Sequence, residues 1–198
     1  MQFITDSLYW ISTGLMVPVV VLLIILFLRS LLLIGGFFGR YASYKKVRRS
    51  LDDAFLGLTS DSIEALVDRL PKKTDALVVV AVREIIAKRE SRAAVGKVIA
   101  NFEVASDKEL GVSRTLSKMG PMLGLMGTLI PMGPALVGLS TGDISSMAYN
   151  MQVAFATTVV GLFTAAVGHL TLQVRQRWAL QDLSDLEYLS DLIEEGRK

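Results

Sequence analysis

The side chains that could do chemistry in this sequence are threonine hydroxyls set in stretches without charge. Thr128 lies within 119–142, and Thr157 and Thr158 lie within 144–174; neither stretch contains Asp, Glu, Lys or Arg. A hydroxyl provides a polar contact in an apolar setting without the cost of a buried charge. A proton path through a membrane normally uses a carboxylate or a histidine. If these hydroxyls border such a path, its carboxylate must therefore come from another chain.

Small residues and prolines recur at helical spacing around these threonines. In the first stretch they are four, three, four, three and four residues apart: Gly120, Gly124, Gly127, Pro131, Pro134 and Gly138. In the second stretch the same alternation gives Ala154, Thr158, Gly161, Ala165 and Gly168. Each set therefore lies on one face of a helix, and small faces let helices approach closely in lipid. Helix packing alone is the plainer interpretation of most of these residues.

Pro131 and Pro134 indicate a less regular interior. A proline inside a helix leaves a main-chain carbonyl without its donor. Within a membrane, such a carbonyl is tolerated only where protein or a water-filled cavity satisfies it. The two prolines and the nearby threonines therefore predict a slightly irregular, polar interior.

Three apolar stretches must position these residues. A helix needs about 20 predominantly apolar residues to cross the hydrocarbon core, and we predict spans at about 11–32, 119–139 and 147–172. Because 52% of the residues are hydrophobic, we expect an all-α integral membrane protein. A cleaved signal peptide is the alternative for the first stretch. It is disfavoured because no Lys or Arg precedes Arg29 and the apolar run is longer than a signal core.

The basic residues predict the orientation of the chain. All 21 Lys and Arg lie within 29–118 or 175–198, and short cytoplasmic loops are enriched in these residues. We therefore expect the amino terminus outside the cell, residues 40–118 inside, a tight hairpin at 140–146 outside, and the tail 173–198 inside. This topology explains the net charge of +2 better than nucleic-acid binding does.

The interior segment 40–118 is expected to be helical. Asp61 and Glu64 have the spacing of a capping pair, and Pro71 would stop the helix that follows. A further helix is predicted to begin at Thr74 and to continue through residue 110 toward the second span. Its β-branched run alone would also suit a strand, but the chain has no second such run to pair with it.

The tail 173–198 continues at helical spacing. Its apolar stripe comprises Trp178, Leu183, Leu186, Leu189 and Leu192 or Ile193. A helix packed against its neighbours is favoured over a lipid-binding or calmodulin-binding helix. No internal repeat or low-complexity linker is visible, so we expect residues 1–198 to form a single domain.

The composition excludes most catalytic chemistry. The chain has no Cys and a single histidine, His169, so it has no disulfide, no thiolate metal site and no zinc site of its own. His169 lies near the inner end of the third span, where an interfacial or capping role is favoured. No nucleophile–base set or phosphate loop is visible. We therefore expect no enzymatic activity, no catalytic residues, no metal and no cofactor.

Two motifs together resemble a known family. "GPMLGLMGTLIPM" at 120–132 and "FATTVVGLFTAAVG" at 155–168 resemble the paired core spans of the MotA/TolQ/ExbB proton-channel family. The expected layout is also similar: one outer span, a large interior segment, a tight outer hairpin and a helical interior tail. The resemblance covers the topology of the whole chain and the motif detail of about 115–172.

This resemblance implies the channel or stator subunit of a motor driven by an ion gradient. It implies a homo-pentamer around two copies of a single-span, MotB/TolR/ExbD-like partner, whose helix carries an intramembrane Asp. The setting would be a prokaryotic plasma (inner) membrane, crossed several times and in contact with lipid. The transported ion would be H⁺ by the family's majority, with Na⁺ as the alternative, and no nucleic acid would bind.

The resemblance also assigns roles by motif position. Thr128 and Thr158 match the hydroxyls that meet the partner's Asp, and we place Thr157 on the ion path with them. Gly127 and Gly161 match the glycines packed closely beside them. The full set expected to pack helices around the partner is Gly120, Pro121, Gly124, Gly127, Pro131, Pro134, Gly161, Ala165 and Gly168.

One position departs from the family pattern. ExbB- and TolQ-like members often carry a Glu five residues before the third-span threonine, where this chain has Val153 beside Gln152. The subfamily, the ion and the process that is energised therefore stay open. Two alternatives also remain: a passive channel or scaffold without a partner, and a small-molecule transporter. The short outer hairpin and the lack of Asp, Glu, Lys and Arg in the second and third spans favour the motor.

Overall fold

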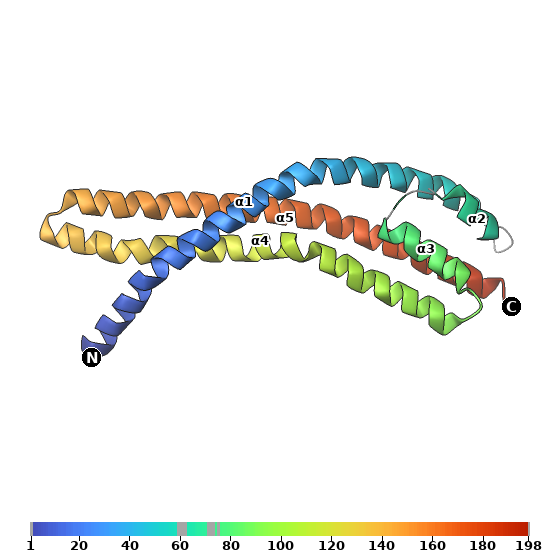
Figure 1. Cartoon of the computed structure of the whole chain (residues 1–198), viewed down its shortest axis with the longest axis horizontal. Coiled ribbons are helices and arrows are strands. Elements are labelled where there is room, and N and C mark those ends of the chain that lie inside the picture. Colours follow the sequence, from blue (N-terminus) through green and yellow to red (C-terminus); the bar gives the residue numbers. More distant parts are fainter. Residues whose placement is uncertain (1, 59–62, 71–73, 75, 198) are drawn as a thin grey trace. The chain divides into compact units, whose positions relative to one another are not determined.

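The computed structural model describes residues 2–58, 63–70, 74 and 76–197, and every regular element in these ranges is a helix (Figure 1). The helices are α1 (Gln2–Phe55), α2 (Ile63–Arg69), α3 (Leu77–Ala87), α4 (Arg92–Thr141) and α5 (Ile144–Glu195). Helices α1, α4 and α5 are long and apolar enough to cross a membrane. They contain the predicted spans 11–32, 119–139 and 147–172, so the all-helical fold with three candidate spans is confirmed. The side on which each end lies stays a prediction.

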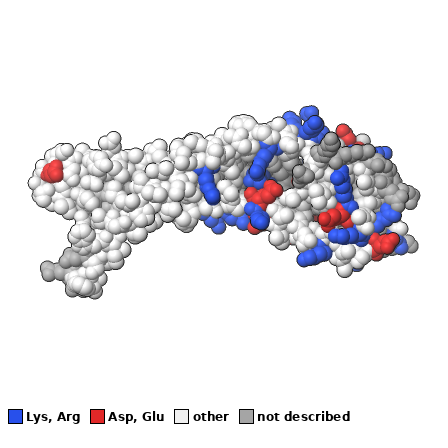
Figure 2. Space-filling view, in the orientation of Figure 1, with Lys and Arg blue, Asp and Glu red and all other residues white. Residues whose placement is uncertain are grey.

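The chain packs as two compact units. We call residues 1–35 and 112–172 the apolar unit, and residues 36–111 and 173–198 the charged unit. Five charged residues fall within the apolar unit: Asp6, Arg29, Arg114, Lys118 and Asp143. In Figure 2 the charged side chains gather over the part that holds α2 and α3, and most of the remaining face is white. The predicted interior segments 40–118 and 173–198 fall in the charged unit, apart from 112–118.

A tight turn joins α4 to α5, as predicted. Gly142 adopts a left-handed backbone conformation with φ of 76°, which residues with a Cβ rarely take up. The amide of Asp143 donates to the carbonyl of Gly138 over 2.8 Å. The Asp143 carboxylate accepts the amide of Ser146 over 3.0 Å and so caps the first turn of α5. Helices α4 and α5 therefore form an antiparallel hairpin.

In the apolar unit, α1 packs across this hairpin. Val19 and Leu23 of α1 form a small buried cluster with Leu123 of α4. Partly buried residues extend this cluster: Leu26, Ile130 and Val160. The rings of Phe27 and Phe163 lie 5.7 Å apart, which adds an aromatic contact between α1 and α5.

A large apolar core holds the charged unit together. It includes the fully buried Leu51, Leu66 and Ile85 from α1, α2 and α3. The run 77–82 is helical and belongs to α3, which confirms helix over strand. From the predicted stripe of the tail, Leu186 and Leu189 are also fully buried in this core. The prediction that this stripe packs against neighbouring helices is therefore confirmed.

One helix boundary was predicted wrongly. The helix expected to run from Thr74 through residue 110 is interrupted, because α3 ends at Ala87 and α4 begins at Arg92. The hydroxyl of Ser91 accepts the amide of Ala94 over 3.3 Å and acts as the N-cap of α4. The proposed cap at Asp61 and the proposed stop at Pro71 lie outside the described residues.

Candidate functional site

Helices α4 and α5 meet backbone to backbone in the apolar unit. A Cβ added to Gly120 would lie 2.8 Å from the carbonyl oxygen of Gly161, and one added to Gly161 would lie 2.7 Å from that of Gly120. A Cβ added to Gly168 would lie 2.5 Å from the main-chain nitrogen of Ser117. Real Cβ atoms essentially never approach another atom below 3.0 Å. No larger side chain therefore fits at these positions unless the backbone moves.

Thr157 fills the space beside Gly127. A Cβ added to Gly127 would lie 2.7 Å from both Cβ and Oγ1 of Thr157, and Thr157 is only 6% exposed. Further along the same contact, Gly124 faces the Cα of Gly161. The glycines expected to pack helices therefore do so between α4 and α5 of one chain.

The other predicted packing residues differ in burial. Pro131 is fully buried, Pro134 and Ala165 are half-buried, and Pro121 is exposed. All three prolines lie inside α4, which continues through them. Packing around a partner helix stays a prediction, and the residues with surface left for it are Pro121, Pro134 and Ala165.

Thr128 and Thr158 lie on the side of the hairpin that faces away from α1. The residues that pack against α1 include Ile130 of α4 and Val160 of α5. Each threonine precedes one of these residues by two positions, and two residues turn an α-helix by about 200°. Both threonines are half-buried. The structure thus brings two of the three predicted ion-path residues to one side of the hairpin, whereas Thr157 is buried between its helices.

Each of these hydroxyls donates to the backbone of its own helix. Thr128 Oγ1 donates to the carbonyl of Leu125 over 2.7 Å, and Thr158 Oγ1 donates to that of Ala154 over 3.0 Å. A hydroxyl has one proton and two acceptor lone pairs. Both oxygens therefore keep only acceptor capacity for a neighbouring donor or a cation.

Sequence reasoning did not assign a role to a pair of hydroxyl side chains, Ser113 and Thr171, at the end of the apolar unit far from the α4–α5 turn. The hydroxyl oxygens of Thr171 and Ser113 lie 3.2 Å apart, and both residues are buried. Only the fold brings Ser113 beside Thr171, because the two residues lie 58 positions apart in the sequence. Within the described residues, no group of His, Asp or Glu side chains could hold a metal ion.

A second polar cluster joins α1 to α5 within the charged unit. Arg48 donates to Asp185 and lies 2.9 Å from Asp52 and 3.7 Å from Asp182. The hydroxyl of Tyr44 donates to Asp182 over 3.2 Å. Three carboxyl groups therefore share one guanidinium and one phenol. Sequence reasoning missed this cluster because its members lie 137 or 138 positions apart.

Burial raises the pKa of the Asp182 carboxyl to about 7. The hydrogen bond from Tyr44 and the positive charge of Arg48 lower this pKa, while the nearby Asp185 raises it further. The ring of Tyr44 stacks on Trp178 with 4.3 Å between ring centroids, and burial raises the pKa of its hydroxyl. The charged unit therefore contains one carboxyl that changes charge near neutral pH.

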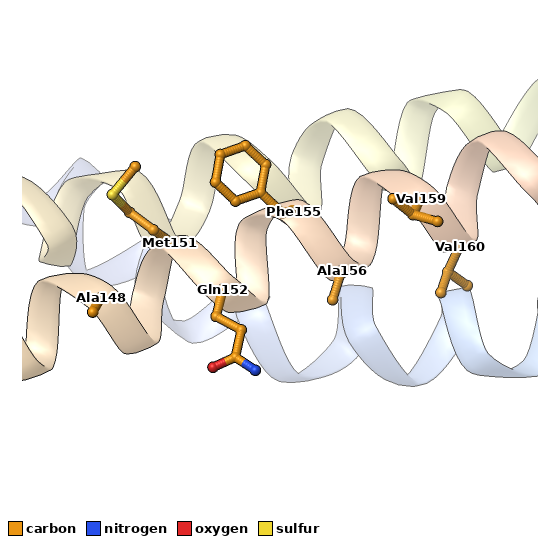
Figure 3. Close-up of a pocket in the computed structure, with 7 residues that line it drawn as sticks. All are labelled: Ala148, Met151, Gln152, Phe155, Ala156, Val159 and Val160. Carbon is orange, nitrogen blue, oxygen red and sulfur yellow. The ribbon is translucent and has the colours of Figure 1, made fainter.

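An open groove runs along α5 in the apolar unit (Figure 3). It is lined by Ala148, Met151, Gln152, Phe155, Ala156, Val159 and Val160. Gln152 is the one polar side chain among them, and in Figure 3 it points to the same side of α5 as Ala156. Val153, the position at which the chain departs from the expected family pattern, is half-buried next to it.

The chain matches the model of a known protein family. The model of the MotA/TolQ/ExbB proton channel family matches residues 68–187. This range holds all of α3 and α4 and most of α5, and therefore both motifs with their threonines. A comparison with curated proteins found no match.

Proposed function

We propose that this chain, which belongs to the MotA/TolQ/ExbB proton channel family, is the ring-forming subunit of an ion-driven membrane motor. In this proposal, five copies surround two copies of a single-span, MotB/TolR/ExbD-like partner whose helix carries an Asp. The gradient across a prokaryotic plasma membrane drives ions, H⁺ rather than Na⁺, past Thr128 and Thr158. The resulting rotation or force serves energised transport or motility.

The common side of Thr128 and Thr158 is the observation that carries this proposal. Because α1 packs on the opposite side of the hairpin, copies with α1 outward would all turn both hydroxyls toward a shared centre. The second and third spans contribute no Asp, Glu, Lys or Arg to such a centre. The titratable group then has to come from the partner.

The hydrogen bonds of the two threonines fit a protonated partner carboxyl. Their protons are donated to Leu125 and Ala154, so their oxygens can accept a hydrogen bond from a carboxylic acid. A carboxylate has no proton to donate, and a threonine could serve it only by giving up a backbone hydrogen bond. This preference for the neutral acid suits a partner Asp that passes the threonines with its proton bound.

The decisive experiment measures proton flux in vesicles that contain the chain and its partner. We expect Thr158→Val to abolish flux, because the acceptor oxygen is lost, and Thr158→Ser to retain it. Thr141→Val is the matched control, since Thr141 is an exposed residue at the end of α4 whose hydroxyl also donates to its own helix. Full flux in the Thr158→Val variant would remove Thr158 from the ion path.

Native mass measurement tests the assembly. We expect a complex of five copies of this chain with two of the partner. A dimer or tetramer would contradict the proposal. Proton flux of equal size in vesicles without the partner would instead support a passive channel.

A further inference from the structure

The part of α1 that follows its apolar run concentrates positive charge. Residues 36–51 contain no Asp or Glu but five basic residues: Arg40, Lys45, Lys46, Arg48 and Arg49. Arg48 turns inward, where it donates to Asp185. The other four are exposed. Most of the charge in this run is therefore directed toward the surroundings of the chain.

Three of the exposed charges share one face of α1. Relative to Lys45, Arg49 lies at about 40° and Lys46 at about 100° around the helix axis. Val47 and Leu51, which are buried in the core of the charged unit, lie on the opposite side at about 200° and 240°. We call Lys45, Lys46 and Arg49 the basic face.

No ion pair within the described residues neutralises the basic face. Arg49 follows Lys45 by four positions and Lys46 by three, so the three side chains are neighbours on the helix surface. Like charges at this spacing destabilise a helix. Asp53, the first acid on this side, lies a further turn away from the apolar run. A bound anion would therefore relieve the repulsion.

Phe38 connects the basic face to the apolar run of α1. Its side chain is 70% exposed and lies about 20° from Lys45 around the helix axis. Between them stand the exposed residues Gly39 and Ala42, and a Cβ added to Gly39 would meet nothing within 4 Å. This side of α1 therefore changes from apolar to basic within about two turns.

Two aromatic rings lie at the level of this change. Tyr41 stands between Phe38 and Lys45, and its ring lies 5.8 Å from that of Trp178 on α5. Tyr and Trp are enriched where a membrane meets water, because their rings combine an apolar body with a polar atom. The aromatic pair therefore indicates the interface at the same height as the basic face.

Lys45 lies within reach of lipid head groups. It follows Phe38 by seven residues, or about 10 Å along the helix. Head groups add about 5–8 Å to each side of the hydrocarbon core, and the long stems of Lys and Arg carry their charges toward the interface. A ligand that covers both Phe38 and the basic face must offer an apolar part and an anionic part side by side. A phospholipid has this form.

We propose that the basic face binds the head groups of anionic phospholipids in the inner leaflet, with Phe38 among their acyl chains. The inference rests on the proposed function, from which it takes the membrane setting and the outward position of α1. Basic clusters next to a span attract anionic lipid by about fivefold in affinity for each Lys or Arg. The orientation of the chain requires basic residues only on this side of the membrane, and not on one face of the helix.

A label beside the basic face tests the inference, because the chain has no cysteine of its own. A fluorophore is attached to Ala42→Cys in the full chain with its partner, in nanodiscs of phosphatidylcholine and phosphatidylglycerol. Nitroxide-bearing phosphatidylglycerol should halve the emission at a mole fraction about fivefold lower, or less, than nitroxide-bearing phosphatidylcholine requires. The preference should disappear at about 1 M salt, where the screening length is about 3 Å.

Charge-matched variants separate the basic face from net charge. Lys45→Gln/Lys46→Gln/Arg49→Gln should abolish the preference for phosphatidylglycerol. The control removes the same charge from exposed positions elsewhere in the charged unit and should retain the preference: Lys97→Gln/Lys108→Gln/Arg197→Gln. Equal loss in both triple variants would overturn the inference.

The chain with an intact basic face gives two further ways to overturn the inference. Equal quenching by the two lipids would show no selection of anionic head groups. A label that neither lipid quenches would show that protein covers this side of α1.

Proton flux distinguishes this inference from the proposed function. Flux that depends on Thr158, in a chain without lipid preference, would overturn the inference and leave the proposed function intact. A clear lipid preference, in a chain whose flux is unchanged by Thr158→Val, would support the inference and contradict the proposed ion path.

Discussion

The two units of this chain hold their helices together by opposite means. In the apolar unit, α4 and α5 touch through glycine, with backbone atoms too close for any added Cβ. In the charged unit, the same two helices contribute large side chains to a buried apolar core, among them Phe102 of α4 and Leu186 and Leu189 of α5. Helices α4 and α5 therefore associate in the apolar unit where side chains are absent, whereas helices of the charged unit associate by burying large side chains.

This difference reflects the solvent that each unit is expected to meet. In water, burial of apolar side chains drives association, so large residues such as Leu186 stabilise a helix contact. Lipid tails are as apolar as leucine, and helices associate there through close packing and polar contacts. The contrast teaches that a helix such as α4 can change its mode of association along its length.

The largest effect is expected where the apolar unit is most crowded. Gly161→Leu places side-chain atoms on the backbone of Gly120 and Gly124, neither of which can rotate away. We expect the α4–α5 contact to be lost, at a cost of about 3 kcal/mol or more. Thermal unfolding in detergent measures this. Gly14→Leu is the control, because nothing lies within 4 Å of a Cβ at Gly14.

The charged unit should lose stability when a large buried side chain is made smaller, which is the reverse of the change at Gly161. Leu186→Ala removes a side chain that is 0% exposed and leaves a cavity, which costs about 2–5 kcal/mol. Leu180→Ala, at a position 64% exposed, should change stability by no more than about 0.5 kcal/mol. Chemical denaturation compares the two. Equal losses would contradict the assignment of the stability of the charged unit to its buried core.

A pH effect of intermediate size is expected in the charged unit. The pKa of Asp182 is about 7 in the folded chain against an ordinary value of 3.8, so the folded state binds the proton more tightly than the unfolded state. Stability is therefore greatest below the lower pKa and falls as pH rises toward 7, above which it levels off.

Asp182→Asn should remove this fall and stabilise the chain at pH 8, by up to about 4 kcal/mol. The fluorescence of Trp178, which stacks on Tyr44, would report the transition between pH 5 and 8. The control is Asp191→Asn, at an exposed position of the same helix. A pH profile that is unchanged in Asp182→Asn would contradict the assignment.

The smallest effect is expected for an exposed ion pair of the charged unit. Lys88 and Glu84 lie 3.0 Å apart with side chains about half exposed. Lys88→Gln should change the free energy of unfolding by less than about 0.5 kcal/mol, as thermal unfolding would show. A larger loss would mean that surface charge, and not the apolar core, holds this unit together.

Local patterns predicted much of the fold. The apolar runs located the three candidate spans, and the alternating spacing of Gly120, Gly124 and Gly161 predicted close helix packing. Both features depend only on residues near one another in the chain. The break before α4 had a local signal too, in the capping serine Ser91, but the apolar run through α3 outweighed it.

Contacts between distant segments could not be predicted in the same way. The spacing of Thr128 and Thr158 did not show that both face away from α1, because that depends on which side α1 covers. Likewise, Asp182 reads as an ordinary surface acid until α1 brings Tyr44 and Arg48 beside it. Such features follow from packing geometry and not from periodicity.

The glycine contact between α4 and α5 has a mechanical consequence. The main chains of α4 and α5 are too close to slide or rotate past one another without a clash. This part of the hairpin is therefore expected to move as one rigid body. In the proposed motor, any conformational change would therefore have to occur elsewhere, at the contacts between neighbouring hairpins.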